Sequence, residues 1–80
     1  MSDISTVRLG SLVRVQDRDG VEEFTIVGGE EADAAMRLIS TESPLGMALL
    51  GRSEGEQVKV RAPGGLRAVT IVQVGIPAHA

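Results

Sequence analysis

The residues best able to do chemistry in this sequence are carboxylates that lie close together. One group is Glu30, Glu31 and Asp33, and a second is Asp17 and Asp19. A hard cation such as Ca²⁺ or Mg²⁺ takes about six or more oxygen ligands in a set geometry. Neither group follows the spacing of a calcium-binding loop. We therefore interpret the first group as a solvated acidic loop and the second as a turn, and we expect no metal site.

Residue counts exclude most other catalytic arrangements. The sequence contains no cysteine and one histidine, His79. Zinc sites need several Cys or His ligands, and a serine nucleophile of the common kind needs a histidine beside it. The pairs Gly28-Gly29 and Gly64-Gly65 lack the spacing of a phosphate-binding loop. We expect no catalytic residues and no cofactor, and hence a protein that is not an enzyme.

Size and charge favour a small domain that binds another protein. The 80 residues suit a single domain, and their net charge is −3. This charge disfavours phosphate binding, and a single aromatic residue, Phe24, leaves no platform for stacking bases. We therefore expect no specific nucleic-acid binding.

No apolar run approaches the roughly 20 residues that span a bilayer, and residues 1–7 show no signal peptide. We therefore expect a cytoplasmic protein without membrane contact.

The N-terminal third predicts a β-hairpin. Residues 7–15 carry apolar side chains mostly at alternate positions, which is the periodicity of a strand. An Asp-rich turn ending in Gly20 follows, and glycine can adopt the positive φ that such turns need. Residues 21–27 predict a second strand, with Phe24 and Ile26 on one face.

The middle of the chain predicts a short strand and then a helix. Residues 30–35 fit either one helical turn or a solvated loop, and residues 37–41 predict the strand. Ser43 is a favourable N-cap, and proline at the next position suits the first turn of a helix. The helix is expected over residues 44–50, with Leu45 and Leu49 facing the sheet and Gly51 closing it.

The C-terminal third predicts a second hairpin. Residues 57–61 alternate, with valines facing inward. Pro63 and Gly64 form a turn in which Gly64 is expected to take the positive φ. Residues 66–74 predict a strand that is partly apolar on both faces, which indicates a central strand or a β-bulge.

Together these elements predict an α+β domain: a curved, mostly antiparallel sheet with one short helix packed on it. Residues 7–76 form the domain, residues 1–6 are expected to be a flexible leader or linker stub, and residues 77–80 a disordered tail. The domain is expected to be a monomer.

Several basic residues could line the outer face of the sheet, and we interpret them mainly as solvated strand positions: Arg8, Arg14, Arg18, Lys59, Arg61 and Arg67.

Several segments resemble the C-terminal domain of the GreA/GreB transcription elongation factor family. The longest, residues 39–51, reads ISTESPLGMALLG and is similar to the family core IS-x-x-SP followed by a small-residue helix and LLG. Four shorter segments resemble family motifs in the same order: FTIVG at 24–28, EAD at 31–33, GEQV at 55–58 and RAPGG at 61–65. The resemblance covers roughly residues 7–75.

The resemblance implies an FKBP-like fold and a partner. In that family this domain docks near the rim of the secondary channel of bacterial RNA polymerase, on a coiled coil of the β′ subunit. The loop before the helix is the docking element, and it maps onto Glu42, Ser43 and Pro44. We add Leu45 and Met47 as partner-binding residues because they follow that loop directly. A carboxylate at Glu42 could pair with a basic residue of the polymerase.

One family feature has no counterpart in this sequence. Full-length family members carry an N-terminal coiled coil whose acidic tip acts in transcript cleavage, and the chain shows no heptad pattern. The resemblance therefore implies docking without cleavage, in either an excised domain or a short paralogue.

The expected FKBP-like fold is compatible with two other functions. A prolyl isomerase of the FKBP type would need an aromatic-lined pocket, and Phe24 alone does not supply one. A related regulator that binds another protein, such as a metabolic kinase, stays open as the alternative.

Overall fold

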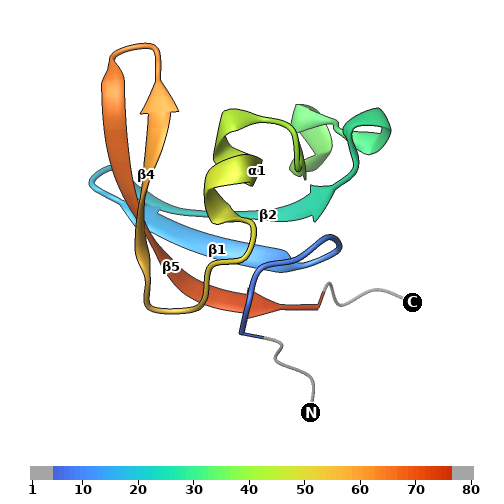
Figure 1. Ribbon diagram of the computed structural model, residues 1–80, viewed down its shortest axis with the longest axis horizontal. Helices are drawn as coiled ribbons and strands as arrows, with labels where there is room; N and C mark the ends of the chain where they lie inside the picture. Colours follow the sequence, from blue (N-terminus) through green and yellow to red (C-terminus); the bar gives the residue numbers. More distant parts are fainter. Residues whose placement is uncertain (1–4, 77–80) are drawn as a thin grey trace.

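The computed structural model describes residues 5–76 and shows one curled sheet with a short helix on its concave side (Figure 1). The five strands lie in the order β3-β2-β1-β5-β4. This confirms the predicted α+β class. The elements are β1 (Leu12–Asp17), β2 (Gly20–Val27), η1 (Gly29–Glu31), η2 (Ala34–Met36), β3 (Leu38–Ser40), α1 (Pro44–Leu49), β4 (Gln57–Ala62) and β5 (Gly65–Gly75). The predicted tail and the first four residues of the predicted leader lie outside the described residues.

Strands β1 and β2 form the predicted antiparallel hairpin, but β1 begins later than expected. Asp17 lies opposite Gly20, whose φ of 131° closes the turn. The prediction of one strand over residues 7–15 was wrong at its start, because Gly10 at φ 94° turns the chain before Leu12. Upstream of that turn, Val7 donates from its N–H to the carbonyl of Arg52 and is buried.

Strand β3 is the one strand of the described sheet that runs parallel to its neighbour. It lies beside β2, with Ile39 opposite Ile26. The chain returns to this parallel position through two short 3-10 helices, η1 and η2. Of the two alternatives for residues 30–35, the structure therefore shows short helical turns. The second is capped by Asp33, whose side chain accepts from the N–H of Ala35 at 3.1 Å.

Strand β5 lies between β1 and β4 and carries a β-bulge, as its apolar residues predicted. Arg14 lies opposite Gln73 and Val15 opposite Ile71, so Val72 is the extra residue. Successive side chains in a strand alternate between faces. The extra residue shifts this alternation by one position. Ile71 and Val74 are therefore both buried, although they are three residues apart, while Val72 is exposed.

Strands β4 and β5 are joined by Pro63 and Gly64, since Ala62 lies opposite Gly65. The positive φ, however, is found at Gly65 (125°) and not at Gly64 as predicted. The turn thus bends the chain one residue later than expected, at the first residue of β5.

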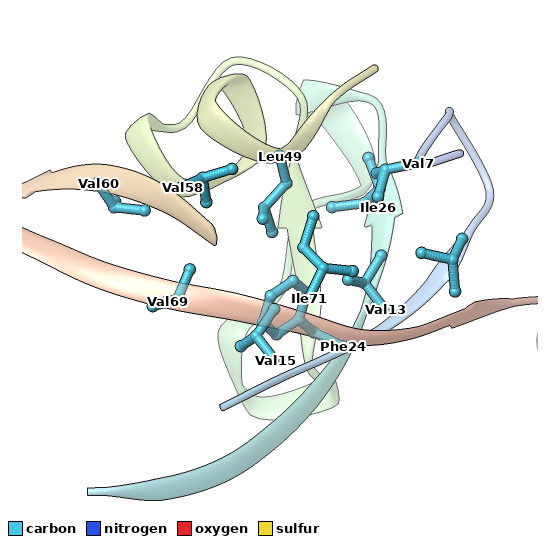
Figure 2. Packing of buried hydrophobic residues seen from close by; sticks show 11 residues of the cluster. Val7, Val13, Val15, Phe24, Ile26, Leu49, Val58, Val60, Val69 and Ile71 are labelled. Atoms are coloured by element: carbon cyan, nitrogen blue, oxygen red, sulfur yellow. The ribbon is translucent and has the colours of Figure 1, made fainter. Parts of the chain in front are cut away.

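The core lies between the concave face of the sheet and α1 (Figure 2). Leu49 points from α1 toward Ile71 and Val13 of the sheet and is fully buried. The buried hydrophobic residues are Val7, Val13, Val15, Phe24, Ile26, Leu49, Val58, Val60, Val69, Ile71 and Val74. No helix among residues 5–76 has the length and apolar character needed to cross a membrane.

Helix α1 begins as predicted and ends one residue earlier. Ser43 is its N-cap, and its hydroxyl accepts from the N–H of Gly46 at 3.0 Å. Leu50 already has a non-helical ψ of 127°, and Gly51 follows at φ 85°. The helix lies so close to β3 that a Cβ on Gly46 would be 1.9 Å from the carbonyl oxygen of Ser40.

We predict that Gly46→Ala destabilises the domain by at least about 2 kcal/mol, because backbone atoms must move to admit the methyl group. Alanine favours an isolated helix over glycine by about 1 kcal/mol, so a loss of stability would show that the close packing outweighs helix propensity. Urea unfolding measures the change. Gly28→Ala is the matched control, since Gly28 has an extended φ of −69° and open space around its Cβ position. Equal stability of Gly46→Ala and wild type would contradict the prediction.

Candidate functional site

The loop between β3 and α1 is held by a short chain of hydrogen bonds. The backbone N–H of Glu42 donates to the hydroxyl of Ser40 at 2.8 Å. The hydroxyl of Ser43 donates to the carbonyl of Ser40 at 2.8 Å while it accepts from Gly46. Thr41 continues the pairing with β2 by donating to Val27. The loop that presents Pro44 is therefore fixed at both ends.

Glu42 extends from this loop toward the start of η1. Its side chain is exposed, and its Oε2 would be 3.1 Å from a Cβ placed on Gly29. A side chain at position 29 would therefore crowd this carboxylate. Among the ion pairs of the described residues, none includes Glu42. Its charge is therefore available to a cation from outside the domain.

A groove of about 310 Å³ opens beside the start of α1. One wall consists of Ser43, Pro44 and Leu45 together with Ile39 of β3. Figure 1 shows the β4–β5 hairpin rising beside α1, and this hairpin supplies the opposite wall. The residues of that wall and of the adjoining β2 are Glu22, Val60, Arg61, Pro63, Arg67 and Val69. The groove thus has apolar sides and charged residues among them.

Arg67 lies in this groove and not on the outer face where the sequence interpretation placed it. It lies directly opposite Val60, which is buried, so both side chains belong to the concave face. Its guanidinium donates to Asp17, whose side chain is only 6% exposed. This pair ties the β1–β2 turn to the hairpin wall of the groove.

The Asp17 carboxylate is stabilised in its charged form. The N–H of Asp19 donates to Asp17 Oδ1 at 2.8 Å and is the main cause that lowers the pKa of Asp17, with Arg67 adding to the effect. The pair therefore stays ionised at neutral pH and keeps the guanidinium of Arg67 in place.

Met47 does not belong to the groove. It is 63% exposed and lies in a separate hollow of about 300 Å³ between α1 and β4. The five residues predicted to bind a partner therefore divide: Ser43, Pro44 and Leu45 line the groove, Glu42 lies on the loop before it, and Met47 faces elsewhere. Among residues 5–76, no three Asp, Glu, His or Cys side chains gather where they could hold a metal ion.

Comparison with known proteins gives the family. Residues 2–76 match the family model described as the C-terminal domain of the transcription elongation factors GreA and GreB. This chain belongs to the GreA/GreB family. The result confirms the resemblance carried by the segment around Ser43 and Pro44.

The curated relatives of this Gre-family domain are longer proteins. GreA of Clostridioides difficile is 45% identical over 74 residues, which cover 90% of this chain and 46% of the relative. GreA of Rhodospirillum rubrum is 46% identical over 74 residues, which cover 88% of this chain and 47% of the relative. The chain thus spans about half the length of the relatives it matches.

Solved structures from the family share the fold. The transcription elongation factor GreA/GreB from Nitrosomonas europaea has a TM-score of 0.74 and 32% identity, over 92% of this chain and 63% of that one. GreA factor homolog 1 of Thermus thermophilus has a TM-score of 0.73 and 29% identity, over 90% of this chain and 48% of that one. The curled sheet with one short helix is therefore the fold of these Gre-family C-terminal domains.

We predict that Asp17→Asn reduces the stability of this Gre-family domain in a pH-dependent way. The pKa of Asp17 is lowered from 3.8 in the fold, so its contribution is complete above the unfolded-state pKa and is lost as the pH falls through the folded-state pKa. The difference in Tm between wild type and Asp17→Asn should therefore be largest near pH 7 and shrink below about pH 3.8.

Thermal unfolding from pH 7 down to pH 2.5 measures this difference. Arg67→Gln serves as a comparison, because it removes the ion pair but keeps the bond from Asp19, so it should lose only part of the acid-sensitive stability. A difference between wild type and Asp17→Asn that does not change with pH would contradict the assignment.

Proposed function

We propose that this Gre-family domain binds bacterial RNA polymerase, and that the loop before α1 docks on the coiled coil of the β′ subunit at the rim of the secondary channel. The observation that carries the proposal is the hydrogen-bonded loop in which Ser40 and Ser43 fix Pro44. Membership of a transcription elongation factor family supports the partner class. The domain would act in the cytoplasm, as a monomer.

The geometry of the loop suits docking on a helical surface. A rigid loop loses little conformational entropy on binding, so more of the contact energy is retained as affinity. Pro44 and Leu45 line an apolar groove that could take one side chain from a helix. Glu42 lies on the loop before that groove and has no ion pair inside the described part of the domain, so a basic residue of the partner could reach it.

The proposal concerns docking alone. The chain spans about half the length of its curated relatives, so transcript cleavage is not transferred to it. An isomerase function gains no support from the groove. Phe24, the only aromatic residue of the sequence, is 3% exposed in the core and is absent from the groove lining.

We predict that the domain binds core RNA polymerase, and that Glu42→Lys and Pro44→Ala each weaken this binding. A docking charge pair contributes on the order of 1–3 kcal/mol, so the loss should be roughly 10- to 100-fold in affinity. Glu42→Lys reverses a charge, and Pro44→Ala removes the ring that restricts the loop. Surface plasmon resonance with immobilised polymerase measures the Kd of each variant.

Asp19→Lys is the matched control. It reverses an exposed charge at the β1–β2 turn. The Asp19 side chain does not itself line the groove, so this variant should bind as wild type does. Circular dichroism should first show that all variants are folded. If wild type does not bind, the partner must be another protein. If wild type and both loop variants bind equally well, the loop is only a helix cap and polymerase contacts another surface.

A further inference from the structure

The free edge of β4 offers unpaired backbone groups. Strand β4 is the last strand of the sheet, and within residues 5–76 it pairs with β5 alone. Gly55 donates to the carbonyl of Ile71 and Ile71 donates to Glu56, which shows that the backbone of Ile71 points toward β4. The backbone N–H and C=O groups of successive strand residues point in opposite directions, so those of Val58 and Val60 bond to β5. Those of Lys59 and Arg61 therefore point away from the sheet. Among the described residues, no backbone hydrogen bond satisfies those outward groups.

Lys59 and Arg61 also place positive charge along this edge. Both side chains are exposed, and neither takes part in an ion pair of the described residues. Their cross-strand neighbours on β5 are Ala68 and Leu66, which are uncharged. Cations on an edge strand oppose pairing with a second copy of the same edge, because like charges would face each other.

The hollow that contains Met47 lies along the inner side of the same edge. It has a volume of about 300 Å³ and is lined by α1 and by the start of β4 through Lys59. Met47 supplies an exposed, flexible apolar surface to it, and such methionine surfaces adapt to varied side chains. Within the hollow, Arg52 and Glu56 already form an ion pair at 3.8 Å, so the cations left for a partner are those of β4.

We propose that the free edge of β4 binds an extended acidic segment of a partner protein as an additional strand. Side chains of an added strand alternate between the two faces of the sheet. Carboxylates on one face would lie beside Lys59 and Arg61, and apolar side chains on the other would enter the hollow beside Met47. The ligand is therefore an extended peptide in which acidic and apolar residues alternate.

This surface is separate from the docking loop, and the inference does not rest on polymerase binding. Arg61 lines the groove as well as the edge, whereas Lys59 belongs only to the edge and its hollow. Substitution of Lys59 therefore tests the edge without altering the residues of the groove.

The test uses a short synthetic peptide of alternating Glu and Val, titrated into the isotope-labelled domain and followed by NMR. We expect the amides of Lys59, Arg61 and Met47 to shift, and the exchange of the Lys59 and Arg61 amides with solvent to slow. Lys59→Ala should weaken binding roughly three- to tenfold by removing one charge. Lys59→Pro also removes the outward N–H and should weaken binding by about a further tenfold.

Lys59→Pro is expected to fold, because proline is tolerated where the N–H of an edge strand faces solvent. An NMR spectrum that is native-like for residues outside β4 would show that the variant is folded. The variant should also bind polymerase as wild type does. The proposal is overturned if Lys59→Pro and Lys59→Ala bind the peptide equally, or if the shifts map to the groove. It is also overturned if sedimentation shows that the domain alone dimerises and that Lys59→Pro abolishes the dimer, since a second copy would then occupy the edge.

Discussion

Helix α1 has six residues, which is too few for its own hydrogen bonds to make it stable in water. It exists because Leu49 packs into the sheet and because Gly46 lets the helix backbone lie directly against the carbonyl of Ser40. Any larger residue at position 46 would force the helix away from β3, and the core residues that pack against Leu49 would become exposed to solvent. The contact between Gly46 and Ser40 therefore determines the position of everything at the start of the helix.

Ser40 is also the point at which the docking loop is fixed. Its hydroxyl accepts from Glu42, and its carbonyl accepts from both the hydroxyl and the N–H of Ser43. The other wall of the groove is tied separately, by the contact of Arg67 with Asp17 across the β1–β2 turn. Two independent sets of polar bonds thus define the groove, one at each side, and the apolar residues between them need no polar partner.

Much of the fold could be predicted because its signals are local. Alternating apolar residues marked β2 and β4, and a run that is partly apolar on both faces marked β5. Ser43 followed by Pro44 marked the start of α1. The late start of β1 depends on Gly10, whose positive φ is not visible in an apolar pattern. The parallel pairing of β3 follows from the path through η1 and η2, which no periodicity encodes.

The candidate site was predicted only in part, for reasons that particular residues make clear. Ser43 and Pro44 carry a local capping signal, so the loop could be found. The opposite wall requires the register of the β4–β5 hairpin. Once Pro63 and Gly64 are placed in the loop, Arg67 must lie opposite Val60 and face inward. Met47 is near the loop in sequence, but helical geometry turns it toward β4.

The position of β5 between β1 and β4 has a consequence for how the protein is made. A ribosome adds β5 last among the five described strands, yet β5 supplies Val69, Ile71 and Val74 to the core and pairs with β4 in the described sheet. Before β5 emerges, a nascent chain can form the β1–β2 hairpin but cannot close the core. Its apolar surface stays exposed during synthesis. Folding must therefore wait for a late, long-range pairing between the first and last strands, a step that slows folding in β-rich domains.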